Sequence, residues 1–179
     1  KYGAKIKLNP SIKSASDRAG LIKAVNENRI DVIATDHAPH TEEEKGRPYL
    51  QMPSGGPLVE HSLVAMLEMS RNGKIPIEKV VEKMCHAPAD LFGIEKRGYN
   101  RKGYKADLVL VDAGKWTVSK ENIQAKCNWS PFEGDSFYYF VTNTFVNGKM
   151  VYENNHPGKK GTFHEDSKGE RLSFNRDTQ

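Results

Sequence analysis

The segment Thr35-Asp36-His37-Ala38-Pro39-His40 brings one carboxylate and two imidazoles within five residues. Asp and His bind hard or borderline metals and move protons near neutral pH. Asp36 could ligate a metal and accept a proton from metal-bound water, or it could cap a turn, as Asp often does. His37 and His40 could share one metal, or one of them could reach a substrate carboxylate. The spacing predicts a functional site with Asp36 as its candidate catalytic group.

Two predicted strands position these residues. The apolar run before Asp36 predicts a buried strand from Ile30 to Thr35. Residues 5–9 predict an earlier short strand, and a helix from Ser16 to about Asn28 connects the two. Strand, helix and strand in this order are typical of a parallel sheet with a right-handed crossover. Barrel-type α/β enzymes place their chemistry at the C-terminal ends of such strands.

Three further polar residues could be functional or structural. Asn9 ends the first predicted strand, so it either faces the same pocket as Asp36 or closes a turn. His61 is expected to be a packed or half-exposed residue of a helix. His86 is expected to help turn one helix into the next.

The middle of the chain is expected to be a loop followed by helices. Residues 41–57 form a long polar stretch with several glycines and prolines, which is typical of a lid or a binding loop. Its charge run, Glu42 to Lys45, is expected to be solvated. Helices are predicted from Leu58 to Asn72, from about Pro76 to Cys85, and from Pro88 to Phe92.

The last third predicts antiparallel strands. A basic, glycine-punctuated connector at residues 97–103 precedes strand patterns at residues 106–112, 116–118 and 137–142. Asn147-Gly148 lies between two apolar runs and predicts a hairpin. From about His156 onward the chain is polar and is expected to be a surface-hugging or disordered tail.

The composition is ordinary for a soluble globular protein. The chain has 179 residues, 37% apolar and 28% charged, with a net charge of +4 spread along its length, so nucleic-acid binding is not expected. No apolar run reaches the length of a membrane span, and the first residues do not form a signal peptide. They also lack an initiator Met, so the chain is expected to be a piece of a longer protein. Two isolated cysteines, Cys85 and Cys127, favour reduced thiols in a cytoplasmic protein over a disulfide framework or a Cys-rich zinc site.

Several segments match one known pattern in order and spacing: Lys7 to Pro10, Thr35 to His40, Ser54 to Glu60, Ala87 to Gly93, Lys102 to Leu110 and Trp129 to Gly134. Together they resemble class I dihydroorotases of the amidohydrolase superfamily, over roughly residues 1–152. Thr35 to His40 resembles the segment after the last barrel strand of those enzymes. His86 replaces the usual Asn, and Ser11-Ile12-Lys13 stands where Pro-Leu-Arg is common.

The resemblance implies an α/β fold in three parts. Residues 1–97 would be the last two strands of a (β/α)8 TIM barrel with their helices. Residues 98–155 would form a small antiparallel β-sandwich module, and residues 156–179 a polar C-terminal tail. The implied reaction is the reversible, zinc-dependent cyclisation of N-carbamoyl-L-aspartate to dihydroorotate in pyrimidine biosynthesis.

The resemblance also implies roles for single residues. Asp36 would ligate a metal of the binuclear zinc site and shuttle a proton between the bridging water and the amide nitrogen. His40, with the backbone of Ala38, would hold the substrate carboxylate, and Asn9 would contact the ring. Backbone contacts would come from the loop at Ser54 and Gly55. His37 has no clear role as a ligand in the family and is expected to support its neighbours.

Most zinc ligands of the family have no counterpart in this chain. They are an early His-x-His pair, a carboxylated lysine and two further histidines, so the fragment alone is expected to be inactive. The implied partners are the small-molecule substrate, a second copy in a homodimer, and aspartate transcarbamoylase. Two alternative interpretations remain: an allantoinase or hydantoinase-like cyclic amidase acting on rings without a carboxylate, and a non-catalytic dihydroorotase-like scaffold.

Overall fold

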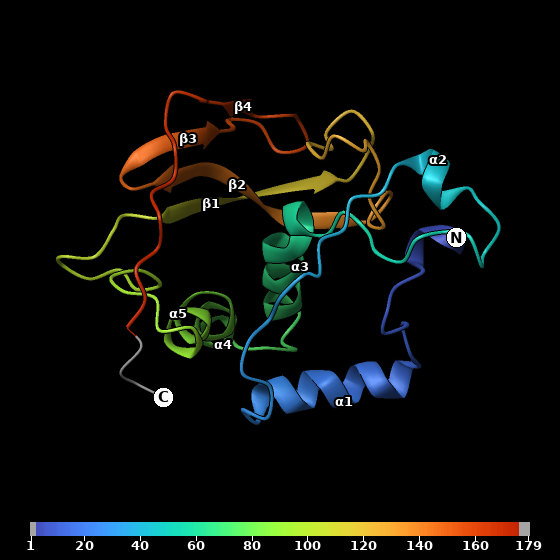
Figure 1. Cartoon of the computed structure of the whole chain (residues 1–179), viewed down its shortest axis with the longest axis horizontal. Coiled ribbons are helices and arrows are strands. Elements are labelled where there is room, and N and C mark those ends of the chain that lie inside the picture. The colour runs from blue at the N-terminus through green and yellow to red at the C-terminus, as the bar shows by residue number, and fades with distance from the viewer. Residues whose placement is uncertain (1–2, 176–179) are drawn as a thin grey trace.

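The computed structural model describes residues 3–175 as a mixed α/β fold, in which a four-stranded antiparallel sheet lies over a group of helices (Figure 1). The helices are the 3-10 helix η1 (Gly3–Ile6), α1 (Ala15–Asn26), α2 (Glu42–Lys45), α3 (Val59–Arg71), α4 (Ile77–Val81), the π-helix η2 (Glu82–His86) and α5 (Ala87–Leu91). The strands are β1 (Leu108–Thr117), β2 (Ser136–Val146), β3 (Lys149–Glu153) and β4 (Thr162–Phe163).

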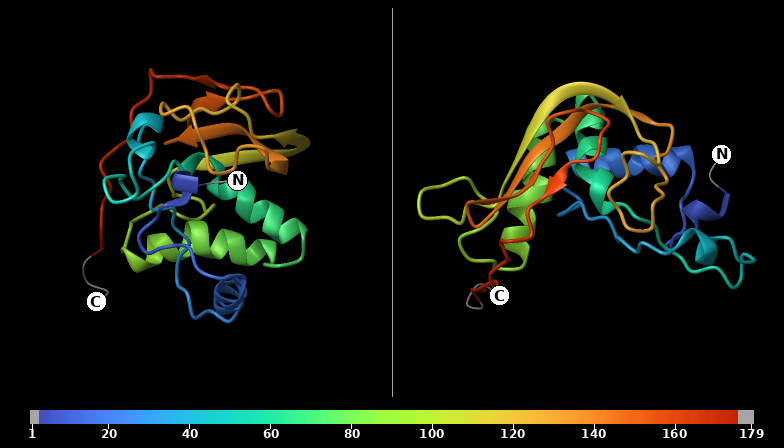
Figure 2. Two further views of the ribbon diagram at one scale, coloured as in Figure 1. Left: turned by 90° about the vertical axis from the view of Figure 1, so that its right-hand side faces the viewer. Right: turned by 90° about the horizontal axis from the view of Figure 1, so that it is seen from above.

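The strands follow one another in the order β1-β2-β3-β4, and each neighbouring pair is antiparallel. The predicted hairpin is confirmed, because Asn147 and Gly148 join β2 to β3 with φ of 53° and 79°. The sheet is strongly curved, and β1 arches over α3 (Figure 2).

The prediction of a β-sandwich is wrong for the described residues, which form one sheet. Helix α3 takes the place of a second sheet, because its Val64 shares a buried cluster with Val118, Ile123 and Phe137 of the sheet region. The predicted boundaries of the three parts stay a prediction. The region predicted as a tail contributes β4 to the sheet.

The predicted helices form, although their ends shift. Helix α1 starts with a capping box between Ser14 and Asp17. The helices expected from about Pro76 to Cys85 and from Pro88 to Phe92 form one continuous helical run, since η2 joins α4 directly to α5. The wider π turn accommodates Pro88, which has no amide hydrogen to donate. Gly93 ends this run with a φ of 61°.

The strands predicted at residues 5–9 and 30–35 are wrong. The first segment begins within η1, and residues 30–35 form no regular secondary structure and have no strand partner among the described residues. The backbone of Ile33 donates to Lys83 O at 3.0 Å. A strand needs a parallel or antiparallel neighbour to satisfy its amides and carbonyls, and residues 3–175 place no strand beside either segment. The predicted crossover is therefore not formed in this part of the chain.

Apolar packing still holds residues 30–35 in place. Ile30 and Ile33 pack on a second buried cluster formed by Val25, Ile75 and Val80. The segment thus runs across the helices, and Asp36 at its end lies on the side of the molecule where α3 begins. None of the helices in residues 3–175 has the length and apolar character needed to cross a membrane.

Candidate active site

Asp36 is exposed and has a φ of 47°, in the left-handed region. Such a conformation costs a residue other than glycine about 1–3 kcal/mol and persists where the surroundings impose it. The surroundings here are a parallel bridge between His37 and Gly56 and a hydrogen bond from Ala38 N to Gly56 O of 3.0 Å. Asp36 is therefore held in an unusual conformation directly before an anchored turn.

His37 caps helix α3. Its Nδ1 accepts hydrogen bonds from the amides of Leu58 at 3.1 Å and Val59 at 3.2 Å. These amides lie at the N-terminus of α3, where backbone donors have no partner within the helix. An Nδ1 that accepts these amides leaves only Nε2 as a possible ring donor. The role that the sequence left open for His37 is the connection of the turn to α3.

Three predicted substrate-binding residues, Ala38, His40 and Gly55, come together. A Cβ atom on Gly55 would lie 2.5 Å from Ala38 Cβ and 3.5 Å from His40 Cδ2, and its φ is +119°, so glycine is required here. The amide of Ala38 donates to Gly56, and that of Gly55 donates to Lys7 O at 2.9 Å. Their backbone donors are already engaged within the chain.

The imidazole of His40 is the group of this cluster that can bind a ligand. It is partly exposed, and its Nδ1 lies 3.6 Å from Glu44 Oε2. The amide of Thr41 holds the pKa of Glu44 below its usual value by donating to that carboxylate. A negatively charged group therefore sits beside the histidine.

The side chains of Asp36, Asn9 and Ser54 form no hydrogen bond or ion pair with other residues in the range 3–175. Asp36 and Asn9 are exposed and Ser54 is half-buried. The backbone connects two of these segments, because Gly55 N donates to Lys7 O, two residues before Asn9. The polar groups that the sequence selected are thus free to contact a ligand.

Two lysines hold the loop of residues 41–57. Lys45 is 2% exposed, so the expectation of a fully solvated charge run is wrong. The pattern Thr41-x-x-Glu44 is a capping box that starts α2. It is a signal in the sequence that residues 42–45 form a helical turn. Lys7 Nζ donates to the carbonyls of Tyr49 and Met52, both at 2.6 Å.

The segment Trp129 to Gly134 contacts the turn directly. Trp129 is fully buried, and its Nε1 donates to His40 O at 2.7 Å. Lys5 Nζ lies 5.5 Å from the centre of the Trp129 ring and pairs with Glu42 at 3.1 Å and Glu133 at 3.2 Å. The turn is anchored at one end by His37 and at the other by Trp129.

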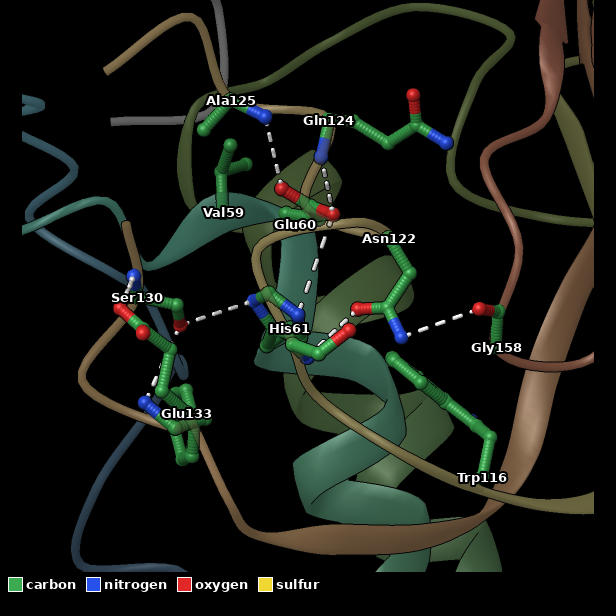
Figure 3. Close-up of polar contacts among 12 residues, drawn as sticks. Val59, Glu60, His61, Trp116, Asn122, Gln124, Ala125, Ser130, Glu133 and Gly158 are labelled. Carbon is green, nitrogen blue, oxygen red and sulfur yellow. Dashed lines mark hydrogen bonds and ion pairs between the residues drawn. The ribbon is translucent and has the colours of Figure 1, made fainter. Parts of the chain in front are cut away.

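The first turn of α3 connects to the same segment (Figure 3). Glu60 accepts the amides of Gln124 at 2.8 Å and Ala125 at 3.0 Å. His61 is fully buried, so of the packed and half-exposed positions that the sequence left open the packed one is correct, and its Nδ1 lies 3.3 Å from Ser130 Oγ. Burial lowers the pKa of His61, and the charge of Glu60 opposes this effect.

A mostly apolar cavity of about 830 Å³ lies between α3 and the sheet. His37 and Pro39 reach it from the turn, and Val59, Phe140 and Tyr152 are among its other walls. The residues predicted for the site are absent from its lining: Asn9, Asp36, Ala38, His40, Ser54 and Gly55. The cavity is beside the predicted site and does not coincide with it.

Within residues 3–175, no group of three or more His, Cys, Asp or Glu side chains could hold a metal ion. A catalytic zinc ion usually has three protein ligands. Asp36 offers one carboxylate, so the described residues do not by themselves fit the binuclear zinc centre that the sequence resemblance implies.

Comparisons with known proteins show the family of this chain. The model of the amidohydrolase family matches residues 4–151, so the chain belongs to that family. Dihydroorotases are its relatives: that of Clostridium acetobutylicum is 37% identical over 153 residues, which are 84% of this chain and 36% of that protein. The dihydroorotase of Halobacterium salinarum is 38% identical over 148 residues, 82% of this chain and 35% of that protein. The chain thus spans about a third of the length of these curated relatives.

Solved structures share the fold. D-hydantoinase from Bacillus sp. AR9 superposes with a TM-score of 0.81 at 26% identity, over 97% of this chain and 39% of that one. Dihydropyrimidinase from Brevibacillus agri NCHU1002 gives 0.78 at 27% identity, over 90% and 36% of the two chains. The predicted resemblance to dihydroorotases and their superfamily is confirmed.

Proposed function

We propose that the chain is the C-terminal part of a dihydroorotase, which interconverts N-carbamoyl-L-aspartate and dihydroorotate in the cytoplasm. Residues 1–97 would complete a (β/α)8 barrel with strands supplied by the rest of a longer protein. The observation that carries the proposal is the exposed carboxylate of Asp36 in a left-handed conformation, before a turn that is anchored at both ends. The identity to curated dihydroorotases supports the same conclusion.

In this proposal Asp36 moves the proton of the reaction. Ring closure joins the carbamoyl amide nitrogen to the carbon of the side-chain carboxyl group, so the nitrogen loses a proton and one carboxyl oxygen leaves as water. Ring opening reverses these changes. An exposed carboxylate with no partner among the described residues is free to carry that proton. The zinc ions that the family implies would be held mainly by residues outside this chain, since Asp36 is the one ligand that the resemblance assigns among residues 3–175.

The other predicted residues would bind the substrate. The imidazole of His40 would hold the substrate carboxylate, while Ala38 and Gly55 would shape the wall beside it. Asn9 and Ser54 have free polar side chains that suit contacts to the ring. A homodimer and an aspartate transcarbamoylase partner belong to the same proposal, and light scattering with and without that partner tests them.

The test is Asp36→Asn in the full-length protein. Loss of a general acid–base should lower kcat for dihydroorotate by about 100-fold or more, with an unchanged melting temperature. Glu43→Gln, at an exposed position of α2, is the matched control and should keep the wild-type kcat. An Asp36→Asn variant with at least half of the wild-type kcat contradicts the proposal.

A hydantoinase-like activity is the second candidate, because D-hydantoinase and dihydropyrimidinase share the fold. Their named substrates lack the carboxylate that His40 would bind. His40→Ala should therefore raise KM for dihydroorotate by on the order of tenfold and leave the KM for an uncharged cyclic amide unchanged. Faster turnover of uncharged rings by the wild-type protein would favour the second candidate.

A further inference from the structure

We infer that Lys45 is a positioning residue for substrate binding, because its buried ammonium group fixes the segment of residues 53–55 against the segment that leads to Asn9. The inference rests on the proposed function and deepens it. In it, Lys45 sets the position of the loop that binds the substrate and makes no contact with the substrate itself.

The ammonium group of Lys45 is caged by three backbone carbonyls. Its Nζ lies 2.9 Å from Gly55 O, 3.1 Å from Pro53 O and 3.2 Å from Lys7 O. An ammonium has three protons, and each one has an acceptor here. The carbonyls come from two segments that are far apart in the sequence, so one side chain connects both.

The cage determines where the predicted substrate contacts lie. Ser54 stands between the two caged carbonyls of its own loop, so its position follows from them. Gly55 also donates to Lys7 O and packs against Ala38 and His40. A displacement of Gly55 would therefore also move Ala38 and His40, in the turn proposed to hold the substrate carboxylate.

Packing alone does not explain a lysine at this position. Burying an ammonium carries a desolvation penalty, while a methionine of similar length would fill the same space without that penalty. Burial, and secondarily the charge of Lys7, lower the pKa of Lys45. In the part of the chain that the structure describes, no carboxylate pairs with Lys45, so carbonyl dipoles offset its charge.

The neighbouring lysine provides a comparison. Lys7 holds the carbonyls of Tyr49 and Met52, which belong to the outer half of the same loop. Lys45 holds the half with Ser54 and Gly55. Both are buried or half-buried cations that bind carbonyls of one loop, yet among these carbonyls only those held by Lys45 include a residue with a proposed substrate role, Gly55.

The experiment compares Lys45→Met with the wild type in the full-length protein. KM for dihydroorotate should rise on the order of tenfold while kcat changes less than about threefold, since binding is lost equally in the ground and transition states. Hydrogen exchange at the Gly55 amide should become faster. Lys102→Met removes an exposed lysine and should leave KM and exchange unchanged.

Two outcomes overturn the inference: a wild-type KM in Lys45→Met, or a fall in kcat with no change in KM. If Lys45→Met does not fold, Lys45→Gln decides, because its amide keeps two donors without the charge. That variant should raise KM at least threefold on the same order-of-magnitude argument, and a wild-type KM overturns the inference. A wild-type protein without dihydroorotate turnover contradicts the proposed function, and hydrogen exchange at Gly55 then decides the role of Lys45 by itself.

Discussion

Histidines at three positions of this chain differ in role because their surroundings differ. His37 accepts two amides at a helix start, His40 presents an imidazole beside the turn, and His61 is buried against Trp116, Phe132 and Phe137 at ring distances of 5.7–6.3 Å. The residue type indicates a capacity for proton transfer or binding. Burial and neighbours decide which of these capacities is used.

The buried His61 makes stability depend on pH. Burial lowers the pKa of His61 from an ordinary value of 6.5. Below pH 6.5, the unfolded chain therefore binds more protons at this position than the folded chain does. The free energy of unfolding should fall as pH decreases below 6.5, by at most about 1.4 kcal/mol per pH unit. Urea denaturation of the full-length protein from pH 7.5 to 5.5 measures this slope.

The matched variants for this prediction are His61→Gln and His156→Gln. His61→Gln should flatten the slope whatever its effect on absolute stability, because the titrating group is gone. His156 is exposed, so His156→Gln should keep the wild-type slope. Equal slopes for all three proteins would show that His61 is not the group responsible.

At the scale of elements, α3 connects the candidate site to the sheet. Its N-terminus receives His37 from the turn, its Glu60 accepts two amides of the segment before Trp129, and its Val64 packs in the core below β2. The same segment returns to the turn through Trp129 and His40 O. The turn, α3 and the loop before β2 therefore form one closed set of contacts.

Removing the cap of α3 should weaken this connection. His37→Leu should cost about 1 kcal/mol of unfolding free energy and speed the exchange of the Leu58 and Val59 amides. His37→Asn should lose less, because its side-chain oxygen can accept in place of Nδ1. Denaturation curves and amide exchange measure both effects. If the two variants behave identically, His37 is not acting as an acceptor.

The hydrogen bond from Trp129 to the turn can be tested against a similar hydrogen bond of a second tryptophan, Trp116. Trp129→Phe keeps an aromatic ring but removes the donor to His40 O, which should cost about 1 kcal/mol and loosen the turn. Trp116→Phe removes a similar bond, from Nε1 to Tyr139 O at 2.8 Å, inside the sheet. Amide exchange at Ala38 and His40 should increase in the first variant and stay unchanged in the second. Equal exchange in both would contradict the role of Trp129.

At the scale of the whole molecule, the sheet exposes an apolar edge. Leu108, Val109, Leu110 and Val111 are 37–49% exposed in succession along β1, which has one neighbouring strand among the described residues. Four consecutive exposed apolar residues are unusual on the solvent-facing surface of a soluble domain. In the proposed longer protein, this edge is a surface that other parts would cover.

The isolated 179-residue chain should therefore be inactive. With added zinc it should give no turnover of dihydroorotate above background, because one carboxylate does not make a catalytic metal site. The full-length protein, assayed in parallel, is the positive control. Robust turnover by the isolated chain would refute both this prediction and the assignment of the remaining ligands to the rest of the protein.

The sequence by itself determined the features that depend on neighbouring residues: the Asn147-Gly148 hairpin, the existence of α1 and α3 with their ends one or two residues off, and the family motif from Thr35 to His40. Propensity, periodicity and motif spacing are local properties, so one sequence suffices for them. Only the tertiary structure decided that residues 30–35 form no strand here, that Lys45 is buried and that His37 caps α3. Strand pairing, burial and hydrogen-bond partners come from residues distant in the chain, so no local pattern specifies them.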